Sequence, residues 1–560
     1  MAAPCLESRT KDCQNCYKCI RHCPVKAISF ASNKASIIHE DCILCGRCYI
    51  VCPQELKVVR NDEEKIKTML KEHDVIASVA PSFIANYGVS FETLRKAMLE
   101  LGFKDVEETA IGATITKRAY DDLLNKGEVD VLISSCCHSI NLLIQKHYKE
   151  ALPYLAKVDT PMLAHAKDIK KRLGADKKVV FVGPCIAKID EADHEKELDG
   201  AITFLELDHL FEEKGIVLIE ENEEPIKEHS KARLFPITGG VIQTMNRDAK
   251  QYNYVFVDGV EEVKRVLEDV IAHKIHHTFI EVNACHGGCV NGPIINAKTH
   301  NLATSSLRVL RSAGTLDFEE PVIKSEDVKH EYAPYAVNHA RPSEKEIEET
   351  FKKMDKKDPK NRLNCGSCGY DSCLEKAIAI IQGKAVVEMC LPFLMAKAQS
   401  FSDKIVANSP NGLMVIDENF KIQLINHAMC MILGVHSPRD LIQKDVSLIL
   451  DTTPFSEALG GERVYERKMY LTAYNKYVNL TVTYDEKYHI LIVLMRDITK
   501  VENEHAKRLE IVQKSVDITD EVIKKNMRAV QEIASLLGES AAETKVALNS
   551  LKETLEEKDD

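Results

Sequence analysis

The chain has 560 residues, 45% of them hydrophobic, which is more than one hydrophobic core uses and predicts several domains. Its 86 acidic and 74 basic side chains give a formal net charge of -12, the wrong sign for a protein that binds nucleic acid or an anionic membrane. No apolar stretch is long enough to cross a membrane, and the N-terminus lacks the apolar core of a signal peptide. We therefore expect a cytoplasmic protein whose 19 cysteines are available to bind metal.

Residues 1–60 contain the run C-x2-C-x2-C-x3-C-P twice. Two-residue spacers let a tight loop direct three thiolates at one 4Fe-4S cluster while the fourth cysteine serves the other cluster. A zinc ribbon, the alternative, would use two C-x2-C pairs instead. We therefore predict a two-cluster, ferredoxin-like domain with Cys5 as a free thiol. One cluster is expected on Cys13, Cys16, Cys19 and Cys52, and the other on Cys42, Cys45, Cys48 and Cys23.

Residues 73–330 alternate short apolar runs with helical segments, which predicts an α/β domain with a mainly parallel sheet. Three of these runs end in cysteine. VDVLISSCC ends at Cys136 and Cys137, VVFVGPC ends at Cys185, and TFIEVNACHGGC contains Cys285 and Cys289. Because ligands of open α/β sheets gather at the carboxyl ends of strands, we expect the three loops to converge on one site.

The segments SSCC, PCxxK with Glu191 following, and EVxACxGGCxxG resemble the three signature segments of the FeFe hydrogenases. APS at 80–82 and FPITGG at 235–240 match further family segments. The resemblance implies an H-cluster, in which a 4Fe-4S half is joined to a two-iron unit carrying CO, cyanide and a dithiolate amine. It also implies H2 and protons as reactants, a redox partner such as ferredoxin, maturation proteins and oxygen sensitivity. The implied ligands are Cys137, Cys185, Cys285 and Cys289, with Cys289 bridging.

The same resemblance gives roles to residues around the ligands. Cys136 would exchange protons with the bridging amine, unless it is only a small buried residue. Lys188 would donate to a cyanide, with an exposed salt-bridge lysine as the alternative. Ser82 would be a further donor, and Phe235 would pack near the di-iron unit. Glu191 either belongs to the site or only holds a basic side chain in place.

The sequence also departs from the family. His138 and Ile140 follow the paired cysteines where the family has Pro and Trp, and the chain has no Trp. Gly183 and Asn283 stand where the family has methionines, which is expected to change the polarity and potential of the cluster. Tyr120 falls where catalytic members carry a carboxylate of the proton path, so we expect slow turnover. Substitute proton carriers, which also fit as surface acids and a structural histidine, are Asp121, Asp122 and His138.

Residues 343–400 carry a further group of four cysteines in a helical pattern, after a charged linker at about 343–361. Their spacing, C-x2-C-x4-C-x16-C, resembles the small Fe-S domain found beside corrinoid proteins and in sensory hydrogenases. It favours a third additional 4Fe-4S cluster over zinc. The four residues are Cys365, Cys368, Cys373 and Cys390.

Residues 401–500 resemble a PAS domain. The segment SPNGLMVIDENFKIQLINHAMCMILG, which contains Asn426, is followed by the strand-like runs KYVNLTVTY and HILIVLMRDIT. His427 and Cys430 are conceivable heme ligands, but lone residues of these types are usually packing or loop positions.

Residues 501–560 are predicted to be helical, with a row at seven-residue intervals in which six of seven members are apolar. The row is Leu509, Val516, Ile523, Val530, Leu537, Thr544 and Leu551. Its companion row shifts along the helix, so both a coiled coil and a helical hairpin fit. A signalling helix and a plain dimer stalk are both consistent with this pattern.

Together these parts predict a multidomain α/β protein: ferredoxin-like, H-cluster, small helical 4Fe-4S, PAS and coiled-helix regions in chain order. We expect a homodimeric hydrogen and redox sensor that oxidises H2 slowly and acts on a separate kinase or phosphatase. One alternative is a catalytic hydrogenase linked to ferredoxin. The other is an Fe-S assembly or scaffold protein without the di-iron unit.

Overall fold

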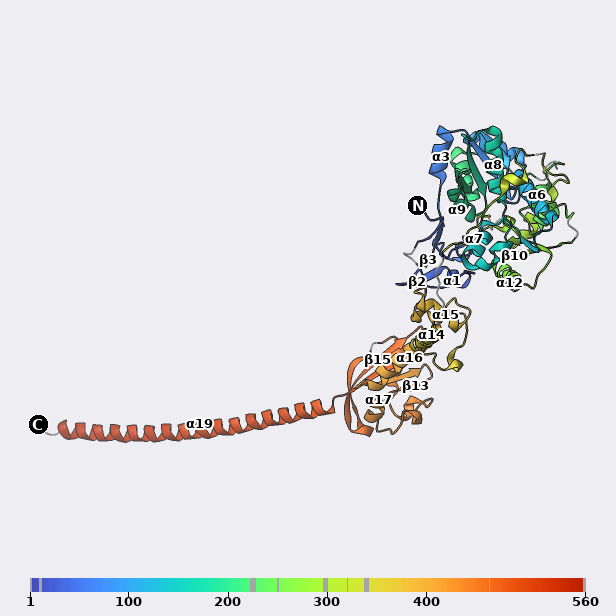
Figure 1. Ribbon diagram of the computed structural model, residues 1–560. Helices are drawn as coiled ribbons and strands as arrows, with labels where there is room; N and C mark the ends of the chain where they lie inside the picture. Colours follow the sequence, from blue (N-terminus) through green and yellow to red (C-terminus); the bar gives the residue numbers. More distant parts are fainter. Residues whose placement is uncertain are drawn as a thin grey trace. The chain divides into compact units, whose positions relative to one another are not determined.

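A computed structural model describes residues 3–9, 13–221, 228–248, 251–295, 301–319, 321–336, 342–462 and 464–556. The chain divides into two compact units, Met1–Leu394 and Met395–Asp560, which are described one at a time (Figure 1). Within the described residues, no helix combines the length and the apolar character that crossing a bilayer requires.

The N-terminal region folds as two similar halves. Both cysteine runs turn through the left-handed region between their second and third cysteines, at Tyr17 (φ 54°) and Gly46 (φ 71°), and then enter a short helix. The two helices are α1 (Lys18–Arg21) and α2 (Arg47–Val51). Two antiparallel strand pairs flank them: β1 (Leu6–Ser8) with β4 (Lys57–Val59), and β2 (Ile28–Ala31) with β3 (Lys34–Ile37).

The following region contains two parallel sheets, so the expectation of one mainly parallel sheet is wrong. The first has the order β6-β5-β8-β9, and the second the order β10-β11-β7. The strands of the first are β5 (Val75–Val79), β6 (Asp105–Glu108), β8 (Lys178–Gly183) and β9 (Gly200–Thr203). Those of the second are β7 (Val131–Ile133), β10 (Asn253–Asp258) and β11 (Thr278–Asn283). Apolar runs alone do not tell which strands pair, so the split was not visible in the sequence.

Helices connect these parallel strands, as parallel pairing requires, and α3 and α13 precede and follow them. They are α3 (Glu63–Glu72), α4 (Phe83–Tyr87), α5 (Phe91–Leu101), α6 (Ala110–Lys126), α7 (His138–His147), α8 (Pro161–Leu173), α9 (Ala187–His194), α10 (Phe204–Lys214), α11 (Gly240–Thr244), α12 (Val260–Ile271) and α13 (Leu302–Ser312). Local signals fix several starts: Thr160 caps α8 with Pro161 as its first residue, and Thr203 and Glu206 form a capping box on α10.

The last part of the first unit is helical and packs on the N-terminal region. Its helices are α14 (Glu344–Lys353) and α15 (Cys373–Ile381), and α16 (Leu391–Asn408) follows. The backbone N–H of Phe30 donates to the carbonyl of Lys384 over 2.8 Å. Tyr370 and Met389 belong to the same buried apolar cluster as Ile20 and Phe30.

The second unit contains a five-stranded antiparallel sheet in the order β13-β12-β16-β15-β14. Its strands are β12 (Gly412–Asp417), β13 (Ile422–Ile425), β14 (Val464–Leu471), β15 (Lys476–Asp485) and β16 (Ile490–Asp497), and its short helices are α17 (His427–Ile432) and α18 (Thr453–Leu459). Buried and less buried residues alternate along β12 and β15, which is typical of a sheet with one face on a core. Cys430 is fully buried in that core and His427 is exposed, so both occupy packing or loop positions.

Helix α19 (Thr499–Glu556) runs for 58 residues without a break. The helical hairpin alternative is therefore wrong. The seven-residue row is exposed along the helix, with Leu509 at 57%, Val516 at 48% and Leu537 at 65% of their full exposure. A long helix gains most of its stability from packing of its apolar face, and in the single chain this row is left uncovered.

Candidate active site and metal centres

The carboxyl ends of strands β7, β8 and β11 carry the cysteines of the predicted active site. Strands β7 and β11 are held in register by two hydrogen bonds: Ser134 N–H donates to the carbonyl of Ile280 (2.9 Å), and Val282 N–H donates to Ser134 Oγ (3.0 Å). Cys185 follows β8, in the other sheet. The ends of the two sheets thus lie at one place.

The four predicted ligands of this site lie close enough to affect one another's ionisation. Burial, and then the charges of neighbouring thiolates, raise the pKa of Cys285 and Cys289 well above the ordinary range and that of Cys185 to about 11. Cys137 is among those neighbours for all three. Thiolates crowded together in this way need a cationic partner, which the iron of a cluster supplies.

No three His, Cys, Asp or Glu side chains in the described ranges converge tightly enough to hold a single metal ion. Ligands of one zinc ion lie about 2.3 Å from it, whereas a 4Fe-4S cluster needs its thiolates spread around a larger core. The donor set is of thiols alone, which is the set that iron-sulfur clusters use.

The loop of Cys289 is packed against the FPITGG segment. Gly288 has φ 88°, and a Cβ added to it would lie 2.4 Å from the carbonyl oxygen of Pro236. The N–H of Val290 donates to that same oxygen over 3.1 Å. Phe235, just before it, is buried and belongs to the apolar cluster against which Cys136 packs. Only glycine at 288 allows this approach, which fixes the position of Cys289.

Cys136 lies beside a buried phenol. The hydroxyl of Tyr120 is 3.3 Å from Cys136 Sγ and 2.9 Å from Ser135 Oγ, and it accepts the N–H of Ser135 over 2.8 Å. Burial, opposed by the Tyr120 hydrogen bond, raises the pKa of Cys136 to about 12. The thiol is thus protonated at neutral pH and has a hydroxyl chain on one side. Tyr120 is the residue at which the resemblance to catalytic members led us to expect a carboxylate.

Lys188 is held in place by Glu191. The ammonium lies 2.6 Å from Glu191 Oε2, and its side chain is 12% exposed, so it is not the exposed salt-bridge lysine of the alternative. Burial lowers the pKa of Lys188, but Glu191 and the thiolates of Cys185 and Cys137 outweigh it and raise that pKa. Glu191 also accepts a hydrogen bond from Thr160. The geometry therefore makes Glu191 the partner of a basic side chain.

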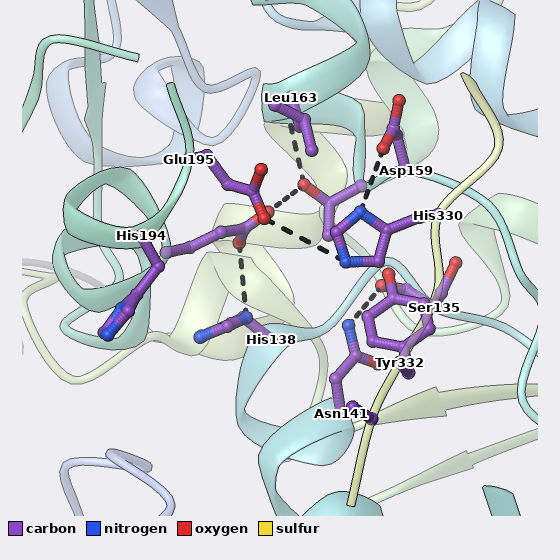
Figure 2. Close-up of polar contacts among 12 residues, drawn as sticks. Ser135, His138, Asn141, Asp159, Leu163, His194, Glu195, His330 and Tyr332 are labelled. Atoms are coloured by element: carbon purple, nitrogen blue, oxygen red, sulfur yellow. Dashed lines mark hydrogen bonds and ion pairs between the residues drawn. The ribbon is translucent and has the colours of Figure 1, made fainter. Parts of the chain in front are cut away.

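A polar pocket adjoins this pair, and Figure 2 shows several of its lining residues. His138 Nε2 lies 3.0 Å from Asp190, and its Nδ1 lies 3.6 Å from Glu191. Across the pocket, His330 lies 3.2 Å from Asp159 and 4.0 Å from Glu195, and the hydrogen bond to Asp159 raises its pKa.

The analysis of the sequence missed the far side of this pocket. Asp159 and His330 are 171 positions apart, and no motif links them. The pocket brings titratable groups to the outer side of the Lys188–Glu191 pair.

Ser82 and Asn283 are both buried. The Ser82 hydroxyl has no hydrogen-bond partner among the described residues, an arrangement that costs stability unless a bound group accepts from it. Asn283 Nδ2 donates to Glu281 over 3.3 Å. A Cβ at Gly183 would lie 2.7 Å from Phe181 Cζ, so Phe181 fills the space in which the family's methionine would begin.

The other proposed proton carriers differ in burial. Asp121 is only 7% exposed, so its assignment as a surface acid is wrong; it accepts the N–H of Asn246, and burial raises its pKa to about 6. Asp122 is exposed. Glu281, which no motif argument singled out, is 1% exposed and accepts the N–H groups of Gly239 and Ile242. Burial raises its pKa to about 7, and its charge acts on Cys136.

The remaining twelve predicted ligands line three cavities, four in each. The first cavity is lined by Cys13, Cys16, Cys19 and Cys52. The second is lined by Cys23, Cys42, Cys45 and Cys48. The third is lined by Cys365, Cys368, Cys373 and Cys390. Buried lysines reach the first and third, Lys57 and Lys376, and a cationic neighbour suits a thiolate-bound cluster. Cys5 is buried outside these cavities.

Three family models match the chain. Residues 73–293 match the C-terminal domain of the iron only hydrogenase large subunit. Residues 6–53 match the 4Fe-4S dicluster domain, and residues 361–392 match the Fe-S cluster family. The matches fall on the three regions in which the cysteines gather.

Two curated proteins are similar to part of the chain. Iron hydrogenase 1 of Clostridium pasteurianum is 27% identical over 305 residues, 42% of this chain and 53% of that protein. The periplasmic [Fe] hydrogenase large subunit of Nitratidesulfovibrio vulgaris is 25% identical over 253 residues, 35% of this chain and 60% of that protein. The chain thus spans little more than half the length of the curated relatives that it matches.

A solved FeFe hydrogenase of Chlamydomonas reinhardtii aligns with 50% of this chain and all of its own, at 18% identity and a TM-score of 0.40. Residues 73–293 therefore match a domain of the FeFe hydrogenase family, and the 4Fe-4S matches lie on both sides of it.

Proposed function

We propose that the chain is a sensory hydrogenase that binds H2 and oxidises it slowly and reversibly to two protons and two electrons. The observation that carries this proposal is the setting of Cys136. A protonated thiol lies next to the four-cysteine group, bonded to Tyr120 and within the field of Lys188. An Fe-S assembly or scaffold protein without the di-iron unit would not need a proton-carrying thiol at this place.

The proposed cofactor is an H-cluster on Cys137, Cys185, Cys285 and Cys289, with CO, cyanide and a dithiolate on its two-iron unit. When bound, it would supply the iron chemistry that splits H2, while the protein supplies thiolates, donors and a proton route. Three additional 4Fe-4S clusters are proposed for the three cysteine-lined cavities.

The surrounding side chains would then act at stated atoms. Cys136 would take up and return a proton at Sγ, with the Tyr120 hydroxyl 3.3 Å away as the next group. Lys188 would donate from Nζ, oriented by Glu191. The hydroxyl of Ser82, which is buried without a hydrogen-bond partner among the described residues, would be a further donor to the cofactor. Phe235 would exclude water by its packing beside Cys136.

Slow turnover is proposed because the side chain next to Cys136 is a phenol. Burial raises the pKa of Tyr120 well above its ordinary range, so its hydroxyl stays protonated at neutral pH. A proton must therefore pass along hydroxyl groups. The path has no ionised carboxylate that could hold the proton for a time, and so it lacks a group whose pKa suits neutral pH.

The sensory part of the proposal assigns residues 401–500 to a PAS domain and residues 501–560 to a signalling helix. The exposed apolar row of α19 supports a homodimer formed through this helix. A charge in the row, Val530→Glu, should dissociate the dimer in sedimentation, and the exposed Glu532→Lys is the control. The output would be a separate kinase or phosphatase in the cytoplasm. Maturation proteins would install the di-iron unit, and a ferredoxin would exchange electrons.

An infrared spectrum of the anaerobically matured protein tests the proposal, first under argon and then under H2. Bands of CO and cyanide that change under H2 are expected, because protein does not absorb where these ligands do. Matured protein without such bands would contradict the proposal and leave an electron-transfer or scaffold protein. Control of the partner by H2 should be lost when residues 402–560 are deleted; control that survives the deletion would refute the sensory part.

A catalytic hydrogenase linked to ferredoxin is the second candidate, favoured by the presence of the buried Cys136 thiol and of Lys188 paired with Glu191. The turnover rate separates the two. A rate in the ordinary enzyme range of about 1–1000 per second would favour the catalyst.

A further inference from the structure

Helix α1 carries ligands for two different cavities. Cys19 lies within α1 (Lys18–Arg21) and faces the first cavity, whereas Cys23 follows the helix and lines the second. The N–H of Cys23 donates to the carbonyl of Ile20 over 3.2 Å, so both thiols belong to one rigid turn. Whatever packs against α1 is therefore next to both N-terminal cysteine sites.

The loop of the third cysteine site packs directly on α1. Gly369 has φ 91°, and a Cβ added to it would lie 3.0 Å from Ile20 Cβ and 3.2 Å from the backbone nitrogen of Arg21. Two side chains of the N-terminal region hold the loop by its carbonyls: Arg21 Nη2 donates to Ser367 over 3.2 Å, and Lys26 Nζ donates to Gly369 over 3.1 Å. Because glycine has no Cβ, the loop approaches the helix at position 369 more closely than it could with any other residue there.

A buried ion pair also joins the third cysteine site to the N-terminal region. Lys384 Nζ lies 2.8 Å from Asp41 Oδ2, with side chains 11% and 1% exposed. Breaking such a pair leaves an uncompensated buried charge, so the two parts are not expected to separate readily. Asp41 precedes Cys42, and its carbonyl lies 2.8 Å from His147 Nε2 of the hydrogenase domain. The third site is thus fixed to the same segment that contacts the hydrogenase domain.

The hydrogenase domain contacts the N-terminal region at the second cavity. Lys146 Nζ donates to the carbonyl of Cys42 over 2.7 Å. A Cβ on Gly46 would lie 2.5 Å from Pro293 Cβ, and the charge of Cys45 acts on Cys285. Pro293 follows the Cys289 loop, so these contacts place the second cavity next to the proposed H-cluster site.

Two tyrosines line the way from the N-terminal sites to the third. Tyr17 lines the first cavity, and besides burial the charges of Cys13 and Cys368 raise its pKa. Tyr370 lines the third cavity and is 2% exposed, and its hydroxyl has no hydrogen-bond partner among the described residues. The charges of Cys368 and Cys23 both act on it. A buried hydroxyl of this kind suits a cluster sulfur that accepts a hydrogen bond.

We propose that the third cysteine site is the outer end of an electron relay that starts at the H-cluster site, passes through the two N-terminal sites and crosses α1. The inference rests on the proposed function and deepens it by naming the exit. Oxidation of one H2 yields two protons and two electrons. The electrons pass singly from one 4Fe-4S cluster to the next, so that each cluster is reduced by one electron and then reoxidised. From the third site each electron passes to a one-electron carrier of the ferredoxin type, which is thereby reduced.

The first test removes the third cluster with Cys368→Ser and Cys390→Ser together, and Cys5→Ser is the control outside all cavities. In dithionite-reduced wild-type protein, electron paramagnetic resonance should show the third cluster magnetically coupled to its neighbours, and removal should leave narrower N-terminal signals. Exchange between H2 and D2 needs no electron exit and should persist, whereas H2-dependent reduction of methyl viologen should be lost.

N-terminal signals that stay identical, or viologen reduction that stays unchanged, would overturn the relay. Absence of exchange in the wild type would instead refute the proposed function, and the resonance comparison would still decide the relay.

A second variant, Tyr370→Phe, removes only a hydroxyl that has no hydrogen-bond partner in the described part of the chain, and it should keep the fold. Loss of the hydrogen bond should make the potential of the third cluster more negative and leave the N-terminal potentials unchanged. Viologen reduction should then slow while exchange persists. A shifted third potential with unchanged viologen reduction would show that electrons do not leave through this site, and an unshifted potential would refute the hydroxyl as a donor to it.

Discussion

The two units of the chain treat buried polar groups in opposite ways. The first unit buries charged side chains in many places, including Arg233 at 0%, Glu281 at 1% and Glu191 at 4% exposure. In the described part of the second unit, Asn426 is the only buried polar side chain. Buried charge costs free energy unless it is paired, so it persists where a site uses it. The contrast separates a unit arranged around chemistry from one arranged around an apolar core.

The largest expected effect comes from removing the thiol at the centre of the first unit. Cys136→Ala should lower the rate of H2/D2 exchange about 10²–10⁴-fold, the usual contribution of a positioned proton-transfer group. Mass spectrometry of the evolved gas measures it. Iron content and the infrared bands should be unchanged, because Cys136 is not a proposed ligand.

The controls for this prediction are Cys5→Ala and Tyr120→Phe. Cys5 is a buried thiol outside the cavities, so its loss should leave exchange unchanged. Tyr120→Phe keeps the ring but removes the partner of Cys136 and of the Ser135 N–H, so an intermediate loss is expected. Full activity in Cys136→Ala would show that the thiol is only a packing residue.

Local spacing explains what the sequence could predict. Cys13, Cys16 and Cys19 are separated by two residues, so short turns alone bring them together, and the structure lines one cavity with them. The three strand-end segments were also expected to converge, but β8 belongs to a different sheet from β7 and β11, so the shared edge of one sheet explains only the pair β7 and β11. The alternation of buried and less buried residues along β15 agrees with the strand-like run KYVNLTVTY.

Pairings between distant segments could not be predicted. The split into two sheets depends on which strands become neighbours, and the apolar runs are alike. The contacts of Lys384 with Asp41 and of His330 with Asp159 join positions 343 and 171 residues apart. Glu281 is part of the EVxAC segment, but the N–H groups that it accepts when buried come from the distant residues Gly239 and Ile242. Such groups become visible only when the chain is folded.

The next effect breaks a buried charge in the first unit. Arg233 forms a two-point ion pair with Glu108, with Nη2 2.6 Å from Oε1 and Nε 2.7 Å from Oε2. Arg233→Met should destabilise the first unit by about 3–5 kcal/mol, because Glu108 keeps its charge without a partner. In scanning calorimetry, only the unfolding transition of the first unit should move to lower temperature.

An exposed pair provides the matched control. Arg265 and Glu262 are 72% and 58% exposed, so Arg265→Met should change stability by less than about 1 kcal/mol. Equal shifts in the two variants would mean that burial does not set the cost of losing charge here. A shift in the transition of the second unit would contradict the independence of the two units.

A smaller effect should appear as pH dependence at Glu281. Burial raises the pKa of this carboxyl from 4.5 to about 7. The folded protein therefore binds the proton more tightly than the unfolded chain, and this group's contribution to stability falls as pH rises from about 4.5 to 7 and then levels off. Glu281→Gln cannot titrate, so its stability relative to wild type should rise by a few kcal/mol at most over that range.

Thermal midpoints of both proteins at a series of pH values measure this difference. The exposed Glu262→Gln is the control and should follow the wild-type curve. A difference between wild type and Glu281→Gln that stays constant over pH 4.5 to 7 would mean that the folded and unfolded carboxyls titrate alike. A difference that falls with pH would reverse the sign and indicate a carboxylate that the fold stabilises.

The smallest effect lies in the second unit, at the one polar side chain that is buried among its described residues. Asn426 Oδ1 accepts the N–H groups of Leu413 and Met429, each over 2.9 Å, and Nδ2 donates to the carbonyls of Val406 and Asn411. Asn426→Ala should lower the stability of this unit by about 1–3 kcal/mol, because a helix cap and a strand end lose their partner together. Calorimetry of the full chain should show the change in the second transition only.

The cap of an exposed turn is the comparison for Asn426. Asp445 accepts the N–H of Ser447 at the surface, so Asp445→Ala leaves groups that water can satisfy and should cost less than Asn426→Ala. If Asn426→Ala loses no more stability than Asp445→Ala, the hydrogen bonds of the Asn426 amide do not stabilise the sheet and its helix. A large loss would show that a single neutral side chain stabilises this unit to an extent comparable with a buried ion pair of the first unit.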